Sequence, residues 1–335
     1  MSEHKNKHTS YDLAQMQSLP LEQKVIMTQR RIQEWYDYWD GQVYVSFSGG
    51  KDSTVLLDIV RKMYPDVPAV FVNTGLEYPE IQAFVKEHEN VTILRPKMRF
   101  DEVLKTYGYP VLSKEIAKKL EAVRLGQNWS KPYVEGTVKT QTGEYSHYNV
   151  DKYAPVLQMD WCISPRCCNV MKKEPVKEYG RRTGRKPITG TMAVESATRK
   201  GQWRRKGCNA FDTPQPISNP MSFWTNQDVL QYLQEYHVLY CSVYGNIVED
   251  KNGKLKTTGL NRTGCVFCGF GCHLDKSPTR FQRLKETHPK QYQYCIRGGE
   301  YDKDGVWGPN KDGLGLGHVF DELNTLYGEH FIDYK

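Results

Sequence analysis

Residues 46–54, Ser-Phe-Ser-Gly-Gly-Lys-Asp-Ser-Thr, are of the types needed to hold a chain of phosphates. Gly49 and Gly50 permit backbone angles that are closed to other residues, and they let main-chain N–H groups approach a ligand closely. Ser53 and Thr54 stand where a helix would begin, so the unpaired N–H groups of its first turn face the same place. The segment therefore predicts a site for the phosphates of a nucleotide.

The charged residues of this segment narrow the chemistry. Lys51 adds a positive charge, and Asp52 suits a site at which Mg²⁺ accompanies the nucleotide. A Walker A loop would need a glycine where Val45 stands and a serine or threonine where Asp52 stands, so that motif is excluded. The segment instead resembles the Ser-Gly-Gly-x-Asp-Ser signature of the PP-loop ATP pyrophosphatases. Members of that family that resemble this chain cleave ATP between its α and β phosphates, release pyrophosphate and adenylylate an acceptor.

The elements that must position this turn alternate along the chain. Short apolar runs and segments of helical periodicity follow one another, as in a doubly wound α/β fold with a mostly parallel, Rossmann-like sheet. In such a sheet ligands bind beyond the carboxyl ends of the strands, where residues 46–54 and 73–77 both fall. The expected elements are a helix over 21–39, a strand over 43–47, a helix over 53–63, a strand over 69–72, a helix over 79–89 and a strand over 91–94.

The composition is ordinary for a soluble globular protein, with 39% hydrophobic residues, 25% charged residues and a net charge of +7. No apolar stretch approaches the roughly 18 residues of a membrane span, and the first residues lack the core of a secretory signal. We therefore expect a cytoplasmic protein with no membrane partner. We expect a flexible tail over 1–20, a nucleotide-binding domain over 21–225 and a smaller, helical, cysteine-rich region over 226–335.

Nine cysteines in a cytosolic chain are not expected to form disulfides. Six of them fall into two groups, and the second is a C-x2-C-x3-C run whose glycines let the backbone fold around an ion. Thiolates at such spacings suit zinc or an iron–sulfur cluster. The two groups are Cys162, Cys167 and Cys168, and then Cys265, Cys268 and Cys272. The others are expected to be small buried hydrophobic residues: Cys208, Cys241 and Cys295.

Three further segments resemble the phosphoadenylyl-sulfate (PAPS) and adenylyl-sulfate (APS) reductase group. Residues 167–175 are similar to its Cys-Cys…Lys…Pro element. Residues 190–199 are similar to its Gly-x-Arg…Glu-Ser-x-x-Arg nucleotide loop, and residues 220–229 to its Pro-Leu-x-x-Trp-Thr-x-x-Asp-Val segment. The resemblance covers approximately residues 21–275 and implies a fold like that of the adenine nucleotide alpha hydrolases.

The resemblances together imply a set of site residues. Lys51 and Asp52 are implied as catalytic groups. The residues implied to hold ATP and Mg²⁺ are Ser46, Ser48, Gly49, Gly50, Lys51, Asp52, Ser53, Thr54, Asn73, Thr74, Gly75, Gly190, Glu195, Ser196 and Arg199. In APS reductases a Cys-Cys pair and a distant Cys-x-x-Cys bind a 4Fe-4S cluster, with Zn²⁺ as the alternative metal here. Position by position, this ligand set carries over to Cys167, Cys168, Cys265 and Cys268.

The departures from the reductase pattern bear on the reaction. Reductases replace the Gly-Lys-Asp-Ser tetrad, which this chain keeps, and their Glu-Cys-Gly element is missing from the last thirty residues, so sulfate reduction is disfavoured. Asn73 stands where relatives commonly carry Asp, and Met192 replaces an Arg of the nucleotide loop. Cys162 and Cys272 are surplus to the four-ligand template. Either could replace a ligand or carry sulfur, and we take Cys272 as the candidate catalytic thiol.

An intact ATP-cleaving loop joined to such a cysteine set resembles the tRNA thiolases and the DNA phosphorothioation component related to APS reductases. The resemblance implies that ATP adenylylates an acceptor oxygen and that a sulfur nucleophile then displaces AMP. The implied partners are a nucleic acid, either tRNA or DNA, and a sulfur donor such as a cysteine desulfurase. The chain could also form a homodimer or be one subunit of a modification complex.

Two alternatives remain open at this point. One is a sulfur-assimilation enzyme, either a sulfate adenylyltransferase or an enzyme like the PAPS and APS reductases. The other is a non-enzymatic, nucleotide-sensing subunit of a modification or defence complex. A basic run over 199–206, with five cations around Trp203, favours an anionic acceptor, because cations bind phosphates while an aromatic ring stacks on bases. The alternative interpretation of residues 199–206 is a solvated loop that does not bind nucleic acid.

Overall fold

The structure is a computed structural model, and it describes residues 6–335. The chain divides into two compact units, each made of separate stretches of sequence. The first, here the sheet unit, comprises the residues up to Asn73, Glu77–Arg95 and Pro175–Thr263. The second, the cysteine unit, comprises Thr74–Leu76, Pro96–Glu174 and Gly264–Lys335. The contiguous division expected at residue 225 is therefore not observed.

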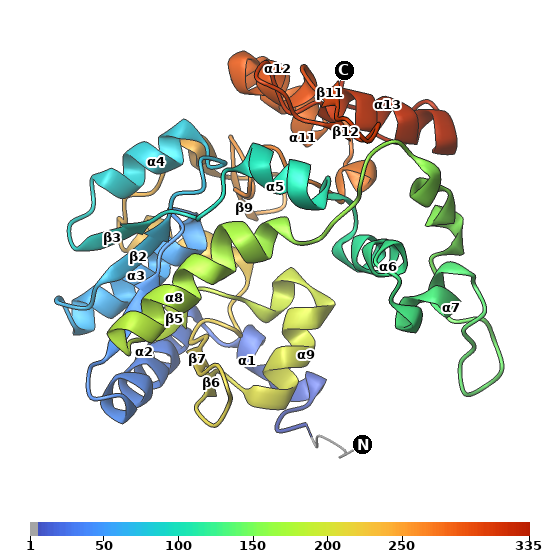
Figure 1. Cartoon of the computed structure of the whole chain (residues 1–335). Coiled ribbons are helices and arrows are strands. Elements are labelled where there is room, and N and C mark those ends of the chain that lie inside the picture. The colour runs from blue at the N-terminus through green and yellow to red at the C-terminus, as the bar shows by residue number, and fades with distance from the viewer. Residues whose placement is uncertain (1–5) are drawn as a thin grey trace. The chain divides into compact units, whose positions relative to one another are not determined.

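The sheet unit contains a six-stranded sheet in the order β3-β2-β1-β5-β7-β6 (Figure 1). All neighbouring strands pair in parallel except β6 with β7. The strands are β1 (Val43–Ser46), β2 (Ala69–Val72), β3 (Val91–Leu94), β5 (Lys186–Thr189), β6 (Asn209–Ala210) and β7 (Ile217–Ser218). The chain winds outward from β1 to β3 on one side and continues from β5 on the other. The expected doubly wound α/β sheet is confirmed, and its switch point lies between β1 and β5.

Side chains of alternate strand residues pack on opposite faces of this sheet. Val43 and Val45 belong to the main core, which includes apolar residues of α2 (Leu21–Tyr38), α3 (Lys51–Met63) and α10 (Asn226–Glu235). Tyr44 and Val70 point the other way and pack with Tyr179 of α8 (Glu174–Thr183), which runs along the sheet in Figure 1. Apolar residues on both faces explain why the strands are uninterrupted hydrophobic runs in the sequence.

Most of the elements expected around the phosphate turn are present within one to three residues of their expected ends. The helix expected at 53–63 begins two residues earlier, at Lys51, because Gly50 already serves as its N-cap. The helix expected at 79–89 is α4 (Pro79–Lys86). We expected a flexible tail over residues 1–20. In the structure, part of this stretch is the helix α1 (Ser10–Ser18), which begins with a Thr9–Asp12 capping box. Residues 1–5 of that tail lie outside the described residues.

The cysteine unit is mainly helical. Its helices are α5 (Phe100–Tyr107), α6 (Lys114–Arg124), α7 (Lys131–Val134), α11 (Arg280–Thr287), α12 (Pro289–Ile296) and α13 (Leu316–Tyr327). A short parallel pair joins β4 (Val111–Leu112) to β10 (Gly269–Phe270), and β11 (Glu300–Tyr301) forms a hairpin with β12 (Trp307–Gly308). The pairing of β4 with β10 explains why residues 96–174 group with the C-terminal region. Among the helices that the structure describes, none combines the length and apolar character that a membrane crossing needs.

Candidate nucleotide site and cysteine cluster

The turn after β1 is shaped by two glycines. Gly49 has a φ of +71°, and a Cβ there would lie 2.9 Å from the side chains of Ile81 and Val85 in α4. A residue with a side chain would therefore be both strained and crowded at this position. Gly50 precedes the first helical residue and supplies no side chain to cap the N–H groups of α3. The sequence thus folds into a turn whose helix end keeps its amides for other partners.

The serines of the signature hold this turn from within. The backbone N–H of Ser48 donates to Ser53 Oγ at 3.1 Å, and the two hydroxyl oxygens are 3.0 Å apart. Ser53 and Thr54 each donate a hydroxyl hydrogen bond to the carbonyl of Gly50. Ser46 ends β1 and is half-buried. These residues fix the backbone on which phosphate binding would depend.

Lys51 and Asp52 form an ion pair at the start of α3. Lys51 Nζ lies 2.9 Å from Asp52 Oδ1, and Lys51 is only 4% exposed. Gly190, in the loop after β5, allows a close approach to this helix start. A Cβ on Gly190 would lie 3.0 Å from the carbonyl oxygen of Asp52 and 3.3 Å from the amide nitrogen of Ser53. The structure therefore brings the loops after β1 and β5 together at the switch point, where this fold binds ligands.

A second charged group stands beside this pair. The carboxylate of Glu195 forms ion pairs with both Arg199 and Arg262, and it accepts a hydrogen bond from the backbone N–H of Met192. Burial, followed by the like charge of Arg262, lowers the pKa of Arg199, while the charge of Asp52 acts in the opposite direction. Two guanidinium groups held by one carboxylate near Asp52 provide positive charge for an anionic ligand.

Ser196 has a structural role in this group. Its side chain caps α9 (Ala197–Lys206) by accepting a hydrogen bond from the backbone N–H of Arg199 at 3.2 Å. The cap sets where α9 begins and so where Arg199 leaves the backbone. Sequence reasoning placed Glu195, Ser196 and Arg199 together, and the structure does bring them together.

Sequence reasoning missed three residues of this site. Arg262 stands three residues before Cys265, outside the segments that resemble the nucleotide-binding motifs of the family. The Tyr244 hydroxyl accepts a hydrogen bond from the backbone N–H of Lys51 at 3.2 Å and lies 2.8 Å from Thr263 Oγ1. Burial raises the pKa of Tyr244 to about 12, so the phenol stays protonated at neutral pH. No local pattern marks these residues, because Tyr244 contacts Lys51 across 193 positions of the sequence and Arg262 contacts Glu195 across 67.

The segment after β2 is divided between the two units. The backbone N–H of Asn73 donates to the carbonyl of Leu94, which continues the sheet beyond β2. Thr74 and Gly75 belong to the cysteine unit, where Thr74 Oγ1 accepts from the backbone N–H of Leu76 at 3.2 Å. The expectation that these three residues help to hold ATP stays a prediction.

Four cysteines of the cysteine unit influence one another. Cys167 and Cys168 directly precede a π-helical turn over Asn169–Lys173, and their sulfur atoms are 4.0 Å apart. Cys265 and Cys268 flank the turn before β10, where the N–H of Cys268 donates to the carbonyl of Cys265 at 3.1 Å. The hydrogen bond to Cys168, then burial, then the charges of Cys168, Cys268 and Cys265 raise the pKa of Cys167. The four expected ligands therefore lie within electrostatic range of one another, although in the described part of the chain no three of their sulfur atoms come within 4.8 Å of each other.

Positive groups favour a thiolate at this centre. The hydrogen bond from Cys167 and then the charges of Lys114 and Lys172 lower the pKa of Cys168 to about 5, against the effect of burial. Arg280 donates to the carbonyls of Cys268 and Phe270 at 3.2 and 2.9 Å, which holds the loop of the C-x2-C motif. Four thiols with nearby cations fit the ligand set of a 4Fe-4S cluster. The assignment of these four residues as ligands stays a prediction.

The surplus cysteines differ from these four. Cys272 is 2% exposed, and burial raises its pKa to about 12, which is unfavourable for the sulfur-carrying thiol expected there. Cys162 is fixed through its backbone, since its carbonyl accepts from the N–H of Tyr109 at 2.6 Å. None of the nine cysteines, all in the described part of the chain, forms a disulfide. The three isolated cysteines are buried, as predicted: Cys208, Cys241 and Cys295.

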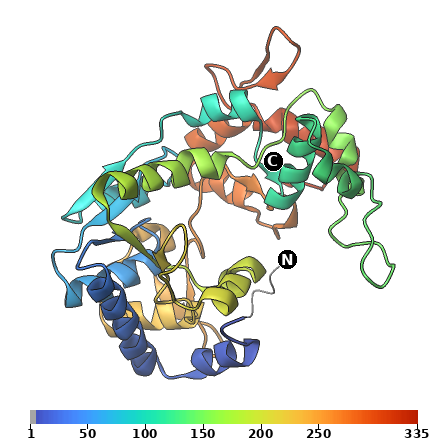
Figure 2. The ribbon, with the colours of Figure 1, turned by 60° about the horizontal axis from the view of Figure 1, so that its bottom comes forward.

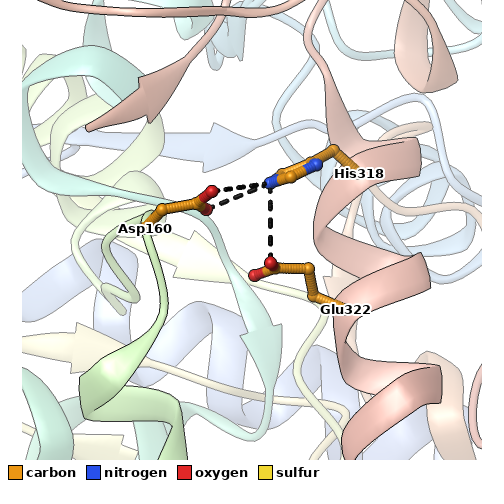
Figure 3. A group of neighbouring side chains, drawn as sticks. All are labelled: Asp160, His318 and Glu322. Carbon is orange, nitrogen blue, oxygen red and sulfur yellow. Dashed lines mark hydrogen bonds and ion pairs between the residues drawn. The ribbon is translucent and has the colours of Figure 1, made fainter. Parts of the chain in front are cut away.

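Two further groups bear on function. Trp203, expected to stack on bases, is 3% exposed and packs against the ring of His8 at 4.8 Å, so the basic run of α9 offers cations without an accessible ring. In the cysteine unit, His318 Nε2 lies 3.0 Å from Asp160 and 3.9 Å from Glu322 (Figure 3). Trp161 Nε1–H and the Tyr301 hydroxyl donate to these carboxylates. We interpret these three residues as a structural contact that holds α13 against the loop that carries Asp160.

Comparison with known proteins supports the family resemblance. The sequence matches the phosphoadenosine phosphosulfate reductase domain over residues 42–112 and 133–270. It is 24% identical to the adenosine 5′-phosphosulfate reductase of Staphylococcus haemolyticus, covering 64% of this chain and 70% of that protein. It is 23% identical to the phosphoadenosine 5′-phosphosulfate reductase of Vibrio campbellii, covering 78% and 88%.

Two other similarities are more distant or more partial. An uncharacterized protein of Methanocaldococcus jannaschii is 27% identical over 289 residues, which cover 82% of this chain. This match spans only 53% of the archaeal protein, or about half its length. The crystal structure of PAPS reductase from Candida auris is 16% identical, with a TM-score of 0.38 over 68% of this chain and 89% of that one.

Proposed function

We propose a function from one premise, which is that this chain belongs to the phosphoadenosine phosphosulfate reductase domain family. The proposed function is that of an ATP-dependent sulfurtransferase that adenylylates an acceptor, with nucleic acid as the acceptor class. The observation that carries it is the ion pair of Lys51 and Asp52 at an intact helix start, with Arg199 and Arg262 held beside it by Glu195. An enzyme that only bound an already activated sulfate would not need groups that neutralise a departing pyrophosphate.

In the proposed first step an acceptor oxygen attacks the α phosphorus of ATP. The bond from that phosphorus to the bridging oxygen breaks, and pyrophosphate leaves with the electron pair. Lys51, the amides at the start of α3 and the two arginines stabilise the added negative charge on the leaving group. Asp52 is placed to bind Mg²⁺ that accompanies the phosphates.

In the proposed second step the terminal sulfur of a persulfide donor attacks the activated centre of the acceptor, the bond to the adenylylated oxygen breaks, and AMP leaves with that oxygen. A thiol co-reactant then attacks the inner sulfur of the acceptor–donor disulfide, so the S–S bond breaks, the outer sulfur stays on the acceptor and the donor is left as a disulfide. Cys167, Cys168, Cys265 and Cys268 would hold a 4Fe-4S cluster, which when bound would supply iron as a site for sulfur. The hydrogen bond from Cys167, with the charges of Lys114 and Lys172, lowers the pKa of Cys168 and favours its thiolate, whereas burial raises the pKa of Cys268.

The test follows the fate of ATP and of the acceptor. Anaerobically purified protein is incubated with ATP, Mg²⁺, a persulfide donor, a thiol reductant and bulk RNA or DNA, and the nucleotides and nucleosides are measured by mass spectrometry. We expect AMP, pyrophosphate and one sulfur-for-oxygen exchange, with AMP formation lost in Lys51→Ala and sulfur insertion lost in Cys268→Ala. Lys62→Ala is the matched control, because Lys62 is an exposed lysine of the same helix, paired with Asp58. Formation of ADP alone would contradict the proposal.

The family itself favours a second candidate, a sulfur-assimilation enzyme. The relatives named as APS and PAPS reductases match 64–78% of this chain, which is the observation in its favour. Reductive release of sulfite from APS or PAPS, with no consumption of ATP, would support this candidate over the first.

A further inference from the structure

The described part of the chain exposes a tryptophan at one place, in the cysteine unit. Trp129 lies in η1 (Asn128–Ser130), directly after α6, and is 47% exposed. Tyr145 and Tyr148 follow in the segment after α7 and are 71% and 51% exposed. Three large aromatic rings are thus exposed to solvent within twenty residues of sequence. Exposed apolar groups that lie close together often mark a binding surface.

Each of these rings has a lysine beside it. Lys118 Nζ lies 5.2 Å from the ring centre of Trp129, and Lys139 Nζ lies 5.4 Å from that of Tyr145. Both distances are within the range of a cation–π contact. Lys131 adds an exposed cation at the start of α7. It forms a long ion pair with Glu135, in which Nζ and Oε1 are 3.7 Å apart. Exposed aromatic and cationic side chains therefore alternate along residues 118–148; we call the set of Lys118, Trp129, Lys131, Lys139, Tyr145 and Tyr148 the aromatic–lysine face.

A buried lysine fixes the face from below. Lys119 is 5% exposed and forms an ion pair with Glu115 at 2.7 Å. Its Nζ also donates to the carbonyl of Tyr148 at 2.6 Å and lies 4.6 Å from the ring of Tyr133. Tyr148 is thus bonded to α6 through its backbone, while its ring packs against that of His147 at 3.9 Å and remains half exposed. Preorganised rings lose little freedom when a ligand stacks on them.

The loop that carries Tyr145 is also held by backbone hydrogen bonds. Lys139 and Tyr145 form an antiparallel bridge, and the N–H of Thr140 donates to the carbonyl of Glu144 at 2.7 Å. Asn149 closes the base by donating to the carbonyls of Gly136 and Val138. The segment projects beside α6 and α7 in both ribbon views (Figure 1, Figure 2). It has the form of a bonded hairpin that presents its aromatic and cationic side chains outward.

Part of this face lies outside the family match. The match stops at residue 112 and resumes at 133, so it omits Lys118, Trp129 and Lys131. Trp129 and the two lysines therefore lie in a part of the chain that the family model does not match, whereas Tyr145, Tyr148 and Lys139 lie inside the match. Residues outside a shared nucleotide-binding domain are a natural place for the recognition of a particular acceptor.

We propose that the aromatic–lysine face binds single-stranded nucleic acid. Bases would stack on the rings of Trp129, Tyr145 and Tyr148, and the lysines would contact phosphates, the combination that single-strand binders use. A protein partner fits less well, because lysine is depleted from the centres of protein interfaces. The inference rests on the proposed function in one respect, that the acceptor is a nucleic acid. It replaces the basic run of α9 as the place of base stacking, since Trp203 is buried there.

The test is direct binding, measured by fluorescence anisotropy without ATP. The probes are fluorescein-labelled oligouridylate and oligodeoxythymidylate of about 12 nucleotides, within the length that one such surface covers. We expect Trp129→Ala and Tyr145→Ala each to weaken binding about tenfold, as the loss of one stacked base does. Lys118→Ala and Lys139→Ala are each expected to reduce the salt dependence of the affinity by about one phosphate contact.

Tyr236→Ala is the matched control. Tyr236 is an exposed ring with Lys62 at 5.1 Å, so it is another aromatic–lysine pair, but one in the sheet unit. Its loss should leave binding unchanged. Thermal melting and far-UV circular dichroism show that each variant is folded. Equal binding by wild type and the Trp129 and Tyr145 variants would overturn the inference, as would capture of a protein instead of the oligonucleotides.

Failure of this inference can be told apart from failure of the proposed function. If sulfur enters RNA or DNA in the Trp129→Ala, Tyr145→Ala double variant at the wild-type rate, the surface is wrong and the function stands. If the oligonucleotides bind through these rings but no acceptor yields AMP and pyrophosphate, the surface stands and the function is wrong.

Discussion

At the scale of single residues, the phosphate turn depends on the absence of side chains. Gly49 combines a left-handed backbone with side chains of Ile81 and Val85 that a Cβ would meet at 2.9 Å, and Gly190 lets the loop after β5 touch the start of α3. Charge then acts on this backbone. Lys51, Arg199 and Arg262 are all matched by carboxylates, so a triphosphate would enter a site whose cations are already placed.

The first residue-scale prediction concerns Gly49→Ala. We expect it to lower the free energy of unfolding by about 2–3 kcal/mol, because backbone strain at positive φ adds to the displacement of α4. Gly143→Ala is the control, since Gly143 also has a positive φ of +84° but has open space around it. Urea unfolding of both variants measures the difference. Equal losses would show that contact with α4 contributes nothing.

At the scale of elements, the sheet unit is held by a buried ion pair between α2 and α10. Lys24 is 2% exposed, and its Nζ lies 2.8 Å from both carboxylate oxygens of Asp228. Asp228 also forms the capping box of α10, since it accepts from the backbone N–H of Thr225 at 2.6 Å. One carboxylate therefore satisfies a buried cation and sets where a helix begins.

The element-scale prediction follows from this double role. Asp228→Ala should destabilise the protein by about 3–5 kcal/mol, because it leaves Lys24 charged and buried with no carboxylate, and only the carbonyl of Gln17 to accept from its Nζ. Lys62→Ala, which breaks the exposed pair with Asp58, should cost at most about 1 kcal/mol. Denaturant unfolding of the two variants provides the measurement. A loss below 1 kcal/mol for Asp228→Ala would mean that water reaches Lys24 and replaces the carboxylate.

At the scale of the whole molecule, each unit is assembled from segments far apart in the chain. The sheet unit needs α10, which packs against α2 and α3, although α10 lies beyond the boundary expected at residue 225. The cysteine unit needs β4 as well as β10, and its four clustered cysteines come from both stretches of sequence. Cysteines about 100 residues apart can share one centre only because these stretches fold together.

The whole-molecule prediction is that the chain cannot be divided at residue 225. A fragment of residues 21–225 keeps all six strands of the main sheet but loses Asp228 and the apolar face of α10. We expect this fragment and the fragment of residues 226–335 to lack a cooperative thermal transition, which circular dichroism detects. The full chain, purified in parallel, should show one. Cooperative unfolding of either fragment would argue against the interleaved organisation.

The order of strands and helices around the phosphate turn could be predicted from the sequence, because local patterns determine it. These patterns are apolar runs of four residues, glycines at the end of a strand and hydroxyl residues at the start of a helix. Each acts only on neighbouring residues, so the strand, turn and helix over 43–63 could be predicted from the sequence. The pairing of two cysteine groups was also within reach, since their types and spacings restrict the chemistry.

Only the tertiary structure decided which side chains are accessible and which distant residues meet. Trp203 and Cys272 have suitable chemical types for base stacking and sulfur transfer, but packing buries both. Tyr244 and Arg262 carry no local signal, yet the fold brings them to the phosphate turn and to Glu195. The physical reason is that burial and long-range contacts depend on how whole elements pack, whereas the sequence determines locally only the backbone that each element can adopt.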